Sequence, residues 1–181
     1  MKRDFLTLSN LLSILRVLLV IPFAAVMLSS IPSANIWGCV LLAVAVLTDK
    51  LDGYVARRYH QETEWGKILD PLADKIGVAA VAFVLLFLGR LPLWFVGAIL
   101  LRDLLIFAGG LVLKARTGKV LPSNLVGKWA VGIISIALFL AMLEVDPILQ
   151  NVLMAATLII LAISLALYVR RFVDVLRAEA G

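Results

Sequence analysis

Four aspartates lie within or at the edge of membrane-length apolar segments of this chain: Asp49, Asp52, Asp70 and Asp74. A carboxylate near hydrocarbon is costly, by about 2.5–3.5 kcal/mol at the centre of a helix on insertion scales. Four carboxylates close together would also repel one another. A bound cation offsets both costs, and ligand sets made only of oxygen favour Mg²⁺, Mn²⁺ or Ca²⁺ over Zn²⁺. The aspartates therefore predict a divalent-metal site.

The spacing of the aspartates predicts how they come together. Asp49 and Asp52 are three residues apart near the end of one apolar segment, and Asp70 and Asp74 are four apart at the start of the next. Both spacings place two side chains on one face of a helix. Because only a short polar stretch separates the segments, we expect antiparallel neighbouring helices. The two carboxylate pairs are then expected to meet near one membrane face and to form a metal cradle.

The elements that must position these side chains are strongly apolar. Hydrophobic residues make up 63% of the 181-residue chain, and its mean hydropathy is +1.07, whereas soluble domains are about 45–50% apolar. Crossing the hydrocarbon takes about 20 residues of helix. Most of the apolar stretches reach that length: 10–30, 34–56, 68–89, 92–113, 127–143 and 148–169. We expect an all-α integral membrane protein, a bundle of six transmembrane helices forming a single domain over residues 1–181.

The chain has a net charge of +5, and its basic residues lie mainly in particular loops between these stretches. Basic residues gather before the first stretch, at 57–67, at 114–128 and after 169, whereas the remaining loops hold Arg90, Glu144 and Asp146. The positive-inside rule predicts that both termini are cytoplasmic. The charge therefore does not predict a nucleic-acid partner. Without an organelle-targeting signal, we expect the prokaryotic inner membrane, with the active site facing the cytoplasm.

The spacing of eight residues resembles the signature of the CDP-alcohol phosphotransferase family. These residues are Asp49, Asp52, Gly53, Ala56, Arg57, Gly66, Asp70 and Asp74. The run N-L-L-S-I-L-R that begins at position 10 is also similar to that family's first helix. Family members move a phosphatidyl or similar substituted phosphoryl group from a CDP-linked donor to an alcohol and release CMP. The resemblance implies a homodimer of six-helix chains and two bound divalent ions, Mg²⁺ or Mn²⁺.

The resemblance also implies roles for individual residues. Asp49, Asp52 and Asp70 would be metal ligands, and Asp74 would complete the metal site and act as general base for the acceptor hydroxyl. The CDP pocket would be lined by Gly53, Ala56, Arg57 and Gly66. This agrees with the chemistry, since phosphoryl transfer needs mainly positioning and charge neutralisation, and the planar fork of Arg57 suits a diphosphate. Close helix packing is the alternative reason for the small residues.

Two further basic residues are candidates for binding the acceptor. Arg102, followed by Asp103, falls inside the fourth stretch, where an Arg by default marks a functional site; the alternative is a structural Arg–Asp pair. Lys128 opens the fifth stretch and could instead anchor to lipid headgroups. A pocket containing Arg102 and Lys128 would suit a phosphorylated acceptor. The C-terminal half is similar to phosphatidylglycerolphosphate synthases, which favours CDP-diacylglycerol and sn-glycerol 3-phosphate as substrates of phospholipid biosynthesis.

Other acceptors and another class of protein stay open. Inositol phosphate, serine and phosphatidylglycerol are alternative acceptors for the same reaction. A divalent-metal transporter is the alternative class, because intramembrane acids also mark ion pathways. Against transport, the aspartates cluster near one membrane face and no comparable polar residues continue to the other.

Overall fold

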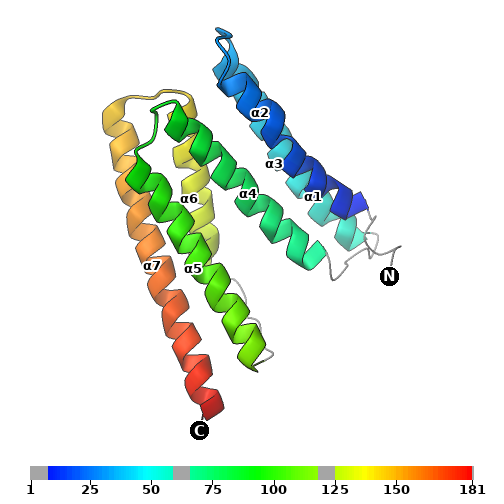
Figure 1. Ribbon diagram of the computed structural model, residues 1–181, viewed down its shortest axis with the longest axis vertical. Helices are drawn as coiled ribbons and strands as arrows, with labels where there is room; N and C mark the ends of the chain where they lie inside the picture. The colour runs from blue at the N-terminus through cyan, green and yellow to red at the C-terminus, as the bar shows by residue number, and fades with distance from the viewer. Residues whose placement is uncertain (1–7, 59–65, 118–124, 181) are drawn as a thin grey trace. The chain divides into compact units, whose positions relative to one another are not determined.

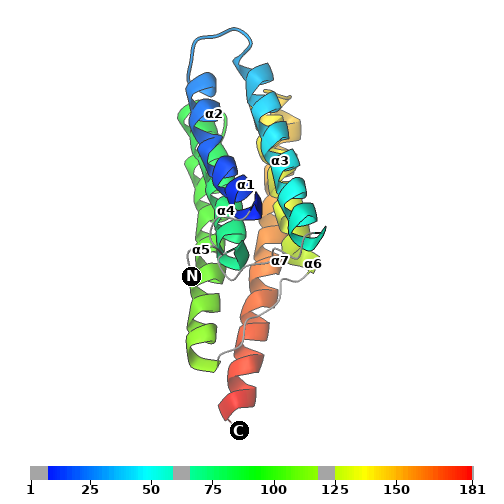
Figure 2. The ribbon, with the colours of Figure 1, turned by 90° about the vertical axis from the view of Figure 1, so that its right-hand side faces the viewer.

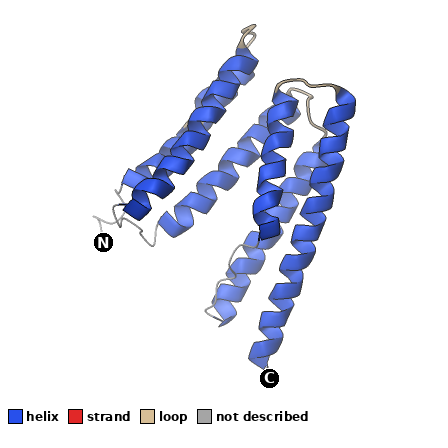
Figure 3. Ribbon diagram, turned by 180° about the vertical axis from the view of Figure 1, so that it is seen from behind, coloured by secondary structure: helices blue, strands red, loops and turns tan. Residues whose placement is uncertain are grey.

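The computed structural model describes residues 8–58, 66–117 and 125–180, with side chains described at 11–48, 51, 72–117 and 126–177. All regular structure within these ranges is α-helix, with no strand (Figure 3). The all-α prediction is confirmed for the described chain. Two units can be distinguished, Met1–Arg90 and Leu91–Gly181, and each is described by itself.

The first unit begins with a helical segment that is interrupted at Leu19. Helix α1 covers Leu8–Leu18 and α2 covers Val20–Met27. Backbone hydrogen bonds bridge the interruption, from the Leu19 N–H to the Leu15 carbonyl at 2.9 Å and from the Phe23 N–H to the Leu19 carbonyl at 3.1 Å. Pro22 has no N–H to donate to the carbonyl four residues earlier, which disturbs the helix at this point. The first predicted apolar stretch is thus one segment with a proline-induced break.

Helices α3 (Ala34–Arg58) and α4 (Gly66–Phe87) complete the first unit. Figure 2 shows them running in opposite directions, as the short connection predicts. Both α1 and α2 pack against both α3 and α4. The face of the first segment that makes this packing carries Ser13, Arg16, Phe23 and Met27, all of which are buried. The α1–α2 segment therefore joins the two helices that carry the aspartates.

The second unit consists of α5 (Leu93–Thr117), α6 (Leu125–Met142) and α7 (Pro147–Ala180) (Figure 1). Helix α7 packs against both α5 and α6. Its start is well defined, because Asp146 Oδ1 accepts hydrogen bonds from the backbone N–H groups of Ile148 at 2.9 Å and Leu149 at 3.3 Å. Pro147 follows in the first helical position, where its missing N–H costs nothing.

Among the described residues, two helices are long and apolar enough to cross a membrane by length and composition, Leu93–Thr117 and Pro147–Arg177. Shorter apolar helical segments cover Leu11–Met27, Ala34–Thr48 and Val126–Met142. Only 22% of the most apolar window of each long helix is buried within the chain. Their apolar side chains thus point largely outward, unlike those of a helix in the core of a soluble protein.

Candidate active site

The backbone places the aspartates on the two helices that the sequence predicts. Asp49 and Asp52 lie in the second half of α3, and Asp70 and Asp74 lie in the first half of α4. Both pairs are therefore near the helix ends that the 59–65 connection joins. The side chains of Asp49, Asp52 and Asp70 lie outside the described set, and Asp74 is described in full.

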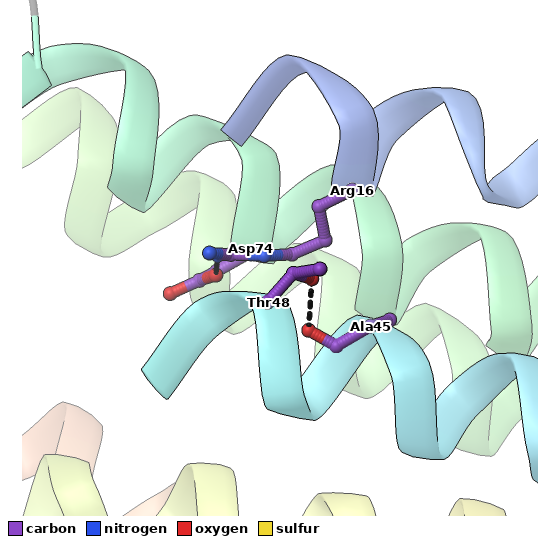
Figure 4. Close-up of polar contacts among 4 residues, drawn as sticks. All are labelled: Arg16, Ala45, Thr48 and Asp74. Carbon is purple, nitrogen blue, oxygen red and sulfur yellow. Dashed lines mark hydrogen bonds and ion pairs between the residues drawn. The ribbon is translucent and has the colours of Figure 1, made fainter. Parts of the chain in front are cut away.

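The carboxylate of Asp74 is held by Arg16. Arg16 Nη1, from the last turn of α1, donates to Asp74 Oδ1 on α4 in a charge-assisted hydrogen bond (Figure 4). The Arg16 side chain is 6% exposed and that of Asp74 is 53% exposed. A buried guanidinium is costly without an anionic partner. The pair thus gives the buried guanidinium an anionic partner and leaves a large part of Asp74 accessible.

Thr48 locates the acid-bearing part of α3 relative to this pair. Thr48 directly precedes Asp49 and is 7% exposed. Its Oγ1 donates to the Ala45 carbonyl within α3 at 2.7 Å, and it lies in the same close-up as Arg16 and Asp74 (Figure 4). Helix α1 packs against both α3 and α4. The meeting of the two carboxylate pairs stays a prediction, because three of the four side chains lie outside the described set.

The described residues contain no group of three or more His, Cys, Asp or Glu side chains that could hold a metal ion. Three of the four predicted ligands fall outside that description, so the metal set stays a prediction. The donor set itself suits a hard divalent cation, because it consists of carboxylates on the consecutive helices α3 and α4. The predicted CDP-pocket residues Gly53, Ala56 and Arg57 lie on α3 and Gly66 begins α4, and nothing beyond these backbone positions is described for them.

Arg102 is buried in the second unit. Its Nη1 donates to Asp103 Oδ1 at 2.6 Å, and its Nη2 donates to Ser164 Oγ on α7. The Nε–H of Arg102 is buried and has no hydrogen-bond acceptor among the described residues. Arg102 therefore links α5 to α7 and keeps one donor unused. Lys128 is exposed in the first turn of α6 and is not one of these partners.

Sequence reasoning missed the contacts of Arg16 with Asp74 and of Arg102 with Ser164. Both join residues far apart in the chain, which no local spacing can reveal. A signal for Ser164 was present in the sequence, since Gln150, Thr157 and Ser164 recur every seven residues along the mainly apolar part of α7. In the structure all three are buried.

Residues 6–168 match the family model described as CDP-alcohol phosphatidyltransferase, and this match runs through both units. The chain therefore belongs to the CDP-alcohol phosphatidyltransferase family, which confirms the class predicted from the eight-residue spacing. It is a transferase of substituted phosphate groups, in a family of phospholipid biosynthesis.

Relatives of this chain carry names for different phospholipid-forming activities. The CDP-diacylglycerol–glycerol-3-phosphate 3-phosphatidyltransferase of Bacillus subtilis is 42% identical over 104 residues, which cover 56% of this chain and about half, 53%, of that protein. A Mycobacterium bovis protein provisionally named a cardiolipin synthase is 36% identical over 155 residues, covering 83% of this chain and 71% of that protein. A Mycobacterium tuberculosis protein provisionally named a phosphatidylglycerophosphate synthase is 31% identical over 172 residues, covering 91% and 80%.

Proposed function

We propose that the chain transfers the phosphatidyl group of CDP-diacylglycerol to a small alcohol, with sn-glycerol 3-phosphate as the leading acceptor, and releases CMP. The observation that carries this proposal is the family match across residues 6–168, which includes the complete eight-residue signature. The Bacillus relative, named for this donor and acceptor, supports the choice of substrates.

In the proposed reaction the acceptor hydroxyl oxygen attacks the phosphorus that carries diacylglycerol, and the bond from that phosphorus to the diphosphate bridging oxygen breaks. Asp74 takes the hydroxyl proton. Asp49, Asp52 and Asp70, with Asp74 completing the set, would hold the divalent ions, proposed to be two Mg²⁺ or Mn²⁺. When bound, the ions would supply positive charge against the diphosphate and the leaving CMP. Gly53, Ala56 and Gly66 leave room for the nucleotide, and Arg57 binds its diphosphate.

The proposed setting is a bilayer, crossed by six spans, with both termini and the aspartates on the cytoplasmic side and two copies in a homodimer. Support comes from the basic loops at 57–67 and 114–128 and from the outward-facing apolar helices. The prokaryotic inner membrane is the proposed location.

Arg102 and Lys128 are proposed to bind an acceptor phosphate. Support for Arg102 is its buried Nε–H, which has no acceptor among the described residues and could donate to an anion. The two terminal nitrogens of Arg102 are already engaged by Asp103 and Ser164. Arg102 thus has a structural role in the described chain, beside any contact with substrate.

Phosphatidylglycerol is a second candidate acceptor. The relative provisionally named a cardiolipin synthase aligns with 83% of this chain, against 56% for the glycerol-3-phosphate enzyme of Bacillus. The relative provisionally named a cardiolipin synthase keeps phosphatidylglycerol as a candidate, whereas the higher identity of the Bacillus enzyme and the longer, 172-residue alignment with the protein provisionally named a phosphatidylglycerophosphate synthase favour glycerol 3-phosphate.

An acceptor panel tests both candidates. Purified protein in detergent is supplied with CDP-diacylglycerol, Mg²⁺ and one acceptor at a time, and CMP release is measured. We expect release with sn-glycerol 3-phosphate, loss of release with EDTA, and recovery on adding Mg²⁺ or Mn²⁺. Release with phosphatidylglycerol alone would reassign the acceptor and keep the reaction class. No release with any alcohol, together with Mn²⁺ uptake into liposomes containing the protein, would favour a transporter.

A further inference from the structure

Arg16 is the buried basic residue of the first unit for which the described contacts suggest a role in the reaction. It lies in the last turn of α1, is 6% exposed, and binds the carboxylate of Asp74 on α4. Ser13, one turn earlier on the same face, is completely buried. The Arg16 guanidinium thus crosses the interface between the first helix and α4 (Figure 4).

Burial makes this contact matter more to the Arg16 charge than to the Asp74 charge. The Asp74 side chain is 53% exposed and can be solvated by water. The Arg16 guanidinium, in contrast, is buried, so its charge bears the desolvation penalty of removal from water. What Asp74 gains is a fixed direction, because a planar guanidinium donates hydrogen bonds in a rigid geometry that an ammonium group lacks.

We propose that Arg16 is a positioning residue for Asp74: from α1 it fixes the orientation of the Asp74 carboxylate on α4 and so sets where that carboxylate meets the acceptor hydroxyl. This inference rests on the proposed function of Asp74. Arg16 needs no contact with substrate in this role. Since a misplacement of about 1 Å at a reacting group costs on the order of 100-fold in rate, loss of the contact should appear mainly in kcat.

The test begins with Arg16→Gln in the full-length chain. We expect kcat for CMP release to fall by about 10- to 100-fold, while KM for CDP-diacylglycerol stays close to that of the unchanged protein and the affinity for Mn²⁺ alone, measured by electron paramagnetic resonance, falls less than it does in Asp70→Asn. Arg16→Lys retains the positive charge but lacks the planar guanidinium with its paired N–H donors, so it should recover part of kcat. Normal kcat in Arg16→Gln would overturn the inference.

A double-mutant cycle separates positioning from general stability. If Arg16 acts through Asp74, then Arg16→Gln should cause no further loss of the residual rate in an Asp74→Asn background. An equal, additive loss in that background would overturn the inference. Should Arg16→Gln fail to fold, as judged by thermal unfolding and Mn²⁺ binding, the same cycle with Arg16→Lys decides.

Arg90 offers a matched control in the same unit. Its Nη1 donates to Asn35 Oδ1 in the first turn of α3 at 2.9 Å, so it too links distant parts of the chain. Arg90→Gln should leave kcat, KM and Mn²⁺ affinity unchanged, and a loss of kcat equal to that of Arg16→Gln would overturn the specific role of Arg16. Absence of CMP release from the unchanged protein would contradict the proposed function, which is a different outcome from an active Arg16→Gln variant.

Discussion

The Arg16–Asp74 pair explains why an arginine interrupts the apolar run of the first helix. An Arg inside a membrane-length segment is costly unless it has a partner. Here the partner is a carboxylate from α4, and the contact leaves the Asp74 side chain about half exposed, at 53%. Arg16 therefore has an anionic partner within an apolar helix packing, and through this contact it orients Asp74, a candidate catalytic group on α4.

Asp70 provides the residue-scale prediction for the metal site. Asp70→Asn removes a ligand charge with almost no change in volume, so we expect CMP release to fall by at least about 100-fold and Mn²⁺ affinity to drop, while the thermal unfolding temperature changes little. The measurements are CMP release and Mn²⁺ binding by electron paramagnetic resonance.

Asp146→Asn is the matched control for this substitution. Asp146 caps α7, and asparagine caps helices about as well as aspartate. Activity and Mn²⁺ affinity should therefore be unchanged in Asp146→Asn. Unchanged values in Asp70→Asn as well would exclude Asp70 as a ligand.

For single residues, the sequence shows which residue types could bind a metal or act in catalysis. It does not show which side chains contact one another. The three- and four-residue spacings of the aspartates predict shared helix faces, and the backbone places all four residues on α3 and α4 near one connection. The partner of Asp74 could not be read in the same way. Arg16 is 58 positions away on a helix that precedes α3, and the contact exists only because α1 packs against both α3 and α4.

At the scale of elements, α7 shows how one long helix packs against two others. Its buried positions alternate in steps of four and three, at Gln150, Met154, Thr157, Leu161 and Ser164. This seven-residue repeat is typical of left-handed helix packing. The polar members also form links, since Gln150 Nε2 donates to the Ala137 carbonyl of α6 at 3.4 Å and Ser164 accepts from Arg102 of α5.

The α5–α7 contact yields a prediction about stability. A Cβ at Gly109 would lie 3.0 Å from Tyr168 Cε1 and 3.1 Å from its Oη, so a larger residue there requires the Tyr168 ring to shift by a few tenths of an ångström. Gly109→Ala should lower the free energy of unfolding by about 1–3 kcal/mol through overpacking. Thermal unfolding in detergent measures the change.

Gly97 of the same helix is the control for Gly109. A Cβ there would meet nothing within 4 Å, so Gly97→Ala should be neutral or stabilising by up to about 1 kcal/mol, because alanine favours helix over glycine. Equal effects of the two substitutions would show that the Tyr168 contact does not limit the packing.

Some helices begin or end at positions that hydropathy alone does not predict. The sixth apolar stretch ends at 169, yet α7 continues to Ala180. Hydropathy falls there because the sequence contains Arg170, Arg171 and Arg177, but arginine, leucine and alanine all favour helix. At the other end of the chain, Pro22 breaks a stretch that hydropathy presents as continuous. The apolar pattern thus predicts which segments are helical, and local backbone chemistry decides where they begin, break and end.

At the scale of the whole molecule, the exposed apolar surface and the distribution of basic residues both indicate a membrane setting. The long helices α5 and α7 expose most of their apolar windows, and large exposed apolar surfaces mark contact with lipid or protein. Basic residues occupy the connections at 57–67 and 114–128, whereas the connection between α2 and α3 carries none. This asymmetry predicts a fixed orientation in a membrane.

Cysteine labelling tests that orientation in a Cys39→Ser background, since Cys39 is the chain's single cysteine. Ser30→Cys places a thiol at an exposed position between α2 and α3, and His60→Cys places one in the basic connection that follows α3. A membrane-impermeant maleimide should label Ser30→Cys in intact cells and His60→Cys only after the membrane is opened. Both variants should keep CMP release, because neither position carries a proposed role.

Labelling of both positions in intact cells would mean that α3 does not cross the bilayer. Labelling of His60→Cys alone would place the aspartates on the outer side, away from the cytoplasmic pool of nucleotide, and would contradict the proposed orientation.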